Sequence, residues 1–74
     1  MSKSPASPFV ARLTDAGLPK VAARFARALK TSPAAAHLAA ADACDEACSH
    51  LSTDTRRMAL LDTLATDLRA AAVA

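Results

Sequence analysis

Residue types that could do chemistry gather in one stretch of the chain, from Cys44 to His50. Cys44 and Cys48 are four residues apart, so a helix through this stretch places both thiols on one face, one turn apart. Two thiolates could grip one soft metal ion, but a stable zinc site needs four ligands. His37 is two turns from Cys44, and His50 points to another side of the helix. The cysteines are therefore half of a metal site, which only a second copy of the chain could complete.

The sequence favours a simpler interpretation, in which both cysteines are small apolar residues of a helix interface. Thiol catalysis needs a base and an orienting carboxylate. His50 and Asp54 supply those types, but Cys48 should face the interior. The remaining acid pairs are interpreted as charges on helix surfaces: Asp42 with Glu46, and Asp62 with Asp67. With one glycine there is no glycine-rich phosphate loop. We expect a protein that is not an enzyme and has no metal and no cofactor.

Start and stop signals divide the chain into helices. Proline at positions 8, 19 and 33 suits the first residue of a helix, Ser7 and Ser32 suit the N-cap, and Gly17 suits a left-handed stop. A cap cluster at 52–54 begins the last helix, and no alternating pattern predicts a strand. We predict an all-α fold, a small bundle of three to four helices at about 8–16, 19–31, 33–50 and 54–72. These helices form a single domain, 8–74, behind a flexible N-terminal tail, 1–7.

The composition limits how well such a bundle can be packed. Of the 74 residues, 21 are alanine, nine are leucine, three are valine and two are phenylalanine, with no isoleucine, tryptophan or tyrosine. A chain this short is only marginally stabilised by its own core. We expect it to complete its interior by docking on another chain, as a homo-oligomer or as a subunit of something larger. The alternative is a marginal bundle that is stable by itself.

The predicted helix 33–50 carries a seam that could dock. Residues spaced 4-3-4-3 follow one face and continue just beyond the helix, which is a heptad pattern of mostly small residues: His37, Ala41, Cys44, Cys48 and Leu51. The last helix has the richest apolar face, formed mainly by Leu60, Leu61, Leu64 and Leu68. We expect the exposed part of the seam to bind a protein partner.

Basic residues share one face of the predicted helix 19–31, namely Lys20, Arg24 and Arg27, with Lys30 at its border, and Arg12 could join them. Residues 1–31 sum to a charge of +5 and residues 32–74 to −3. Such asymmetry suggests an anionic partner, although the same charges could simply be solvated. The partner could be an acidic protein surface or the acidic helix of a second copy, with Asp42, Asp45 and Glu46. Nucleic acid would be held by phosphate contacts alone, because the next helix opens on three alanines.

The compartment expected for this chain is the cytoplasm, since two cysteines do not make a disulfide framework and no signal peptide is evident. The basic, alanine- and serine-rich start is similar in composition to a transit peptide, but Gly17-Leu18-Pro19 interrupts it. No stretch reaches the roughly 20 apolar residues of a membrane span. The excess of alanine and arginine fits a GC-rich bacterial genome.

Together these patterns predict a small non-catalytic helical protein that binds a larger macromolecule, as an accessory subunit, an adaptor or a small inhibitor or regulator of the kind that phages and plasmids encode. The alternative is a nucleic-acid-associated regulator that contacts phosphates through the basic helix face.

Overall fold

The computed structural model describes residues 8–50 and 54–73. Within these ranges it contains four helices: α1 (Pro8–Asp15), α2 (Pro19–Ala28), α3 (Pro33–Ser49) and α4 (Thr55–Val73). The predicted all-α bundle is confirmed, with helix limits within three residues of those expected. The predicted tail at 1–7, the Ser7 cap, Leu51, and Ser52 and Thr53 of the cap cluster lie outside the described residues.

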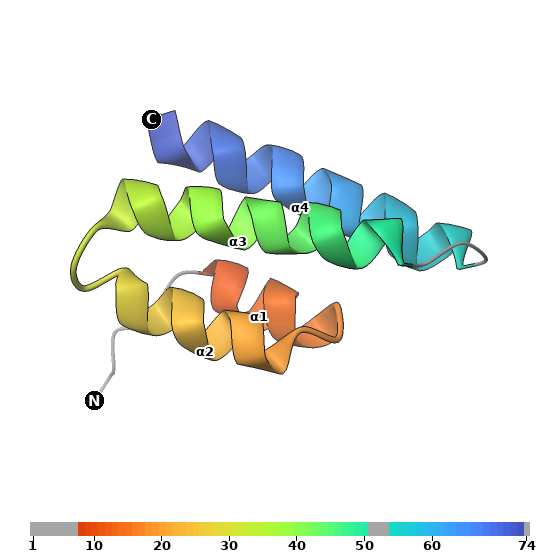
Figure 1. Cartoon of the computed structure of the whole chain (residues 1–74), viewed down its shortest axis with the longest axis horizontal. Helices are drawn as coiled ribbons and strands as arrows, with labels where there is room; N and C mark the ends of the chain where they lie inside the picture. The colour runs from red at the N-terminus through yellow and green to blue at the C-terminus, as the bar shows by residue number, and fades with distance from the viewer. Residues whose placement is uncertain (1–7, 51–53, 74) are drawn as a thin grey trace.

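The helices form two antiparallel pairs. Figure 1 shows the long helices α3 and α4 side by side, with α2 packed beneath α3 and α1 beside α2. The α3–α4 pair makes the most extensive contact, and α1 reaches α4 at only a few positions. At the end where α3 leads into α4, the long pair extends beyond the short one (Figure 1).

The helix starts and ends that proline and glycine predict lie where expected, with one difference. Pro19 and Pro33 begin their helices. Helix α2 ends at Ala28 rather than residue 31, because Thr31 N–H donates to the Ala28 carbonyl at 3.0 Å in a tightened turn. Ser32 has the extended backbone of an N-cap, as a residue before proline prefers, but its side chain makes no capping bond.

Two capping contacts determine where α1 ends and α4 begins. Gly17 has φ +88°, and the Leu18 N–H donates to the Leu13 carbonyl at 2.9 Å, which is the Schellman pattern. The Arg57 side chain of α4 also reaches this turn, where its Nε donates to the Ala16 carbonyl at 3.0 Å. At the start of α4, Asp54 Oδ1 accepts the Arg57 backbone N–H at 3.0 Å, so Asp54 is the N-cap.

The core is built from leucines of α4 against small residues of α3. Helix α4 buries Leu61, Leu64 and Leu68, whereas α3 buries only alanines and Cys44. Half of the buried apolar residues are alanine: Ala16, Ala22, Ala36, Ala40, Ala41 and Ala65. The larger ones outside α4 are Leu13 and Phe25. The helices can therefore approach closely, but none of the side chains that α3 buries is bulky enough to fill the space around it.

We predict that Leu64→Ala lowers the free energy of unfolding by about 3 kcal/mol, because it removes a fully buried side chain from a small core. Leu60→Ala is the matched control on the same helix, since Leu60 is 42% exposed, and it should lower the free energy by less than about 1 kcal/mol. Urea titration followed by circular dichroism measures both. Equal losses would contradict the packing described above.

We predict that Gly17→Ala destabilises the fold by about 1–2 kcal/mol, because alanine is strained at a left-handed φ. The new methyl would also occupy the place of the Arg57 guanidinium, which would have to give up its bond to the Ala16 carbonyl. In an Arg57→Ala background only the backbone strain remains, so the same substitution should still cost about 1 kcal/mol. A neutral Gly17→Ala in urea titration would rule out this turn geometry.

Candidate functional site

An open groove of about 510 Å³ runs between α2 and α3. Its α3 wall consists entirely of alanines: Ala35, Ala36, Ala39, Ala40 and Ala43. The α2 wall contributes Val21, Phe25, Ala28, Arg24 and Arg27, and Thr31 and Ser32 close one end. The groove exists because methyl groups are too short to fill the space between the two helices.

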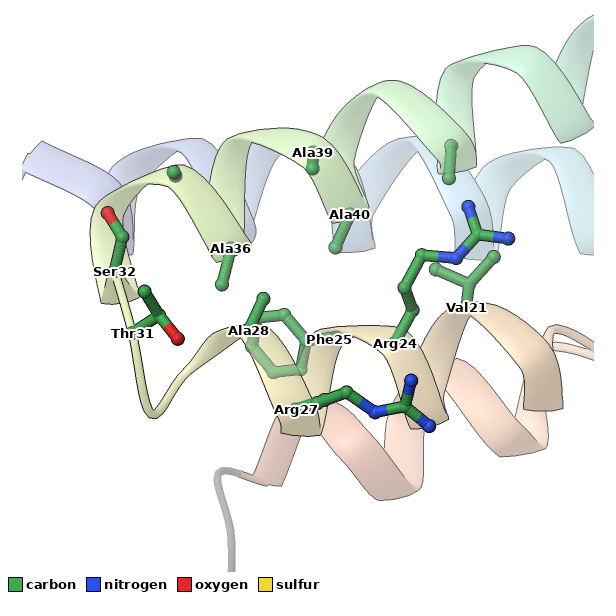
Figure 2. Close-up of a pocket in the computed structure, with 12 residues that line it drawn as sticks. Val21, Arg24, Phe25, Arg27, Ala28, Thr31, Ser32, Ala36, Ala39 and Ala40 are labelled. Atoms are coloured by element: carbon green, nitrogen blue, oxygen red, sulfur yellow. The ribbon is translucent and has the colours of Figure 1, made fainter.

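Two arginines border this apolar groove. Arg24 and Arg27 are exposed and one turn apart on α2, and Figure 2 shows them extending from α2 across from the alanines of α3. Neither forms an ion pair with a carboxylate in the part of the chain that the structure describes. The same is true of Lys20 and Lys30, so the whole basic face predicted on this helix is without an intramolecular counter-ion among those residues.

Arg12 does not share this situation. Its guanidinium pairs with Asp67 of α4 at 3.0 Å and lies 5.5 Å from the centroid of the Phe9 ring. Arg12 thus differs from Lys20, Arg24, Arg27 and Lys30 in having a carboxylate partner, and its participation in the basic face stays a prediction.

Helix α3 carries the opposite charge on its outer side. Asp42 and Asp45 both contact Arg69 of α4, Asp42 at 3.4 Å, and the hydrogen bond that Arg69 donates to the Asp45 carboxylate raises the pKa of the Arg69 guanidinium. The Asp42 side chain nevertheless stays 80% exposed. Glu46 is exposed, and its carboxylate forms no ion pair within residues 8–50 and 54–73.

The seam predicted on α3 is mostly part of the core. Ala41 and Cys44 are fully buried, so in this fold they cannot meet a partner, and that part of the expectation is corrected. They belong to one core cluster with Leu61, Leu64 and Leu68 of α4. Cys48 is partly buried, and its Sγ donates to the Met58 carbonyl at 3.8 Å.

His37, the first residue of the seam, joins the short and long helix pairs. Its ring lies edge-to-face on Phe25 and Phe9, with ring centroids 5.0 and 5.5 Å away. Its Nδ1–H donates to the Pro33 carbonyl at 2.6 Å, which orients the ring. Phe25 lines the groove, and His37 packs against the Phe25 ring, so His37 helps to hold this wall of the groove in position.

The cysteines have the surroundings of structural residues. Burial, with a further contribution from the negative charge of Asp45, raises the pKa of the Cys44 thiol from 9.0 to about 11. Among the described residues no three potential ligands lie together as a metal site would require. The geometry thus gives Cys44 a packing role, and both cysteines are free thiols.

The alanine side of the groove was not anticipated from sequence. Its signal is the repeat Ala35, Ala39 and Ala43, four residues apart, which places three methyl groups on one face. Repeated alanine is equally typical of any stable helix, and only the position of α2 beside it turns this face into a groove.

No protein-family model, curated protein or solved structure matches the chain. None of the helices described is long and apolar enough to cross a membrane.

We predict that stability falls as pH rises from about 9 to about 11, because the unfolded chain loses the Cys44 proton at lower pH than the folded chain does. Since lysines also titrate in this range, the measurement is the difference between the wild type and Cys44→Ala in urea titrations across that range. The variant should lack this part of the pH dependence. Parallel pH profiles for the two proteins would contradict it.

Proposed function

We propose that this chain is a non-catalytic binding module whose α2/α3 groove takes up one helix of an acidic protein partner. The observation that carries the proposal is the combination of an apolar groove with two arginines, Arg24 and Arg27, that lack a carboxylate partner in the described structure. Acting in this way, the chain would serve as an accessory subunit, an adaptor or a small inhibitor. Its two free cysteines suit the cytoplasm.

A helix is the occupant that fits the shape of this site. The groove lies between two packed antiparallel helices, so a third helix can rest on both. Its alanine wall allows another helix axis to approach to about 8 Å, the short end of the usual range. Binding of an amphipathic helix in an apolar groove is a common mode of protein recognition.

The charge of the occupant follows from the arginines. Arg24 and Arg27 are three residues apart on α2, so their guanidinium groups can meet two carboxylates one turn apart on a bound helix. Such contacts at the border of an interface increase the association rate and the specificity for a partner more than they increase the affinity. The apolar area comes from the lining residues that keep exposed surface: Val21, Ala28, Ala35, Ala39 and Ala43.

Nucleic acid is the other partner class that the basic face allows. Phosphates could contact the same arginines, but the groove beside them offers methyl groups and one buried ring rather than exposed aromatic stacking surfaces. An acidic helix uses both the charge and the apolar floor, and it is therefore the partner that we propose.

The test is a nuclear magnetic resonance titration of the ¹⁵N-labelled chain with a lactam-stapled 18-residue helix that carries leucines on one face and two glutamates one turn apart. We predict shifts at residues 24–28 and 35–43. Arg24→Glu and Arg27→Glu should each weaken binding about tenfold by charge reversal. Ala39→Leu should also weaken it, by filling the groove.

Matched controls lie on α4, where Arg56→Glu and Ala70→Leu make the same changes at exposed positions outside the groove. Both should bind the peptide as the wild type does. A lysine version of the peptide should not bind. Binding of a 20-base-pair DNA duplex at residues 20–30 without peptide binding would overturn the proposal in favour of nucleic acid, and so would shifts outside the groove.

A further inference from the structure

The exposed side of α3 carries two kinds of residue in one line. Ala35, Ala39, Asp42 and Glu46 are all exposed, and their 4-3-4 spacing keeps them on one face of the helix. The first half of this line borders the groove, and the second half is acidic. We call these four residues the outer α3 stripe.

The outer α3 stripe is complementary to itself when two copies run antiparallel. A twofold axis between positions 40 and 41 places Ala35 opposite Glu46 of the second copy, and Ala39 opposite Asp42 of the second copy. Small residues then face longer ones along the whole line, and the same surface serves both copies, as a twofold interface requires.

The arginines of α2 flank the alanine half of that stripe. Helices α2 and α3 are antiparallel and joined at residues 29–32, so Arg27 lies toward the Ala35 end of the groove and Arg24 one turn further along. In the antiparallel pairing, Glu46 of the second copy therefore comes to the Arg27 end, and Asp42 of the second copy comes toward Arg24.

We propose that the occupant of the groove is α3 of a second copy of this chain, in a twofold dimer held by Arg27–Glu46 and Arg24–Asp42 pairs. This inference rests on the proposed function and names its partner. Within helix α2 the Lys, Arg, Asp and Glu residues are all basic, and within α3 they are all acidic. The chain thus carries the acidic helix that its own groove requires.

The Arg27–Glu46 pairing cannot be satisfied inside one chain. Along α3, Glu46 is eleven residues from Ala35, a rise of about 16 Å, which is beyond the reach of an arginine placed beside Ala35. Glu46 and Arg27 accordingly have no ion-pair partner in the described parts of a single copy, although their charges are opposite.

The experiment is sedimentation equilibrium of the full chain with two reversed-charge variants, Arg27→Glu and Glu46→Arg. The wild type should be a dimer that weakens as salt is raised. In a dimer of either variant alone, residues 27 and 46 carry the same charge at both contacts. The dissociation constant of that dimer should therefore rise at least about tenfold. Both sites are exposed, and thermal unfolding checks that both variants fold.

An equimolar mixture of the two variants gives the decisive result. In the mixed dimer, residues 27 and 46 have opposite charges at both contacts, so dimers should return to within about threefold of the wild-type affinity. Arg56→Glu by itself is the matched charge control, because it leaves both contacts in place and should dimerise as the wild type does. A mixture that stays monomeric overturns this dimer.

The outcomes separate this inference from the function on which it rests. The wild-type chain could be monomeric up to 500 µM and still bind the stapled acidic helix at residues 24–28 and 35–43. This result would overturn the proposal that the occupant is a second copy, but it would leave the proposed function of the groove in place. A chain that neither dimerises nor binds the peptide overturns both. If both hold, the peptide should compete with the second copy and dissociate the dimer.

Discussion

The rest of the structure depends on the small size of the side chains that α3 presents. Nothing that α3 buries is larger than Cys44, so its inner face can be covered only by a neighbour that supplies the bulk. Helix α4 does this with Leu61, Leu64 and Leu68. Helix α2 has one buried aromatic residue, Phe25, and cannot do the same along its whole length. One side of α3 is therefore closed, and the other is a groove.

The charged residues divide in the same way between the α4 side and the groove side of α3. The ion pairs in the described structure all involve α4, through Asp67 with Arg12 and through Arg69 with the two aspartates of α3. On the groove side, the cations of α2 and Glu46 of α3 are without such partners in those residues. Exposed ion pairs add little stability, so the fold does not depend on pairing these charges. They are therefore available to bind a partner.

Local rules predicted the helices well, because proline, glycine and capping residues act over a few residues. Gly17 and Asp54 behave as expected, whereas α2 ends early because the residues before Pro33 form a tight turn. The spacing of Ala41 and Cys44 identified a real face of α3 but not which element covers it. The groove depends on how α2 lies against Ala35 and Ala39, which periodicity in one helix cannot show.

The most direct test of the account is to dilute the ¹⁵N-labelled wild-type chain from 1 mM to 10 µM and follow its amide resonances. Reversible shifts at residues 24–28 and 35–46, with residues 57–68 unchanged, are the result that binding of a second copy at the α2/α3 groove predicts. Resonances that stay fixed over the whole range, or shifts confined to α4, would contradict such a dimer.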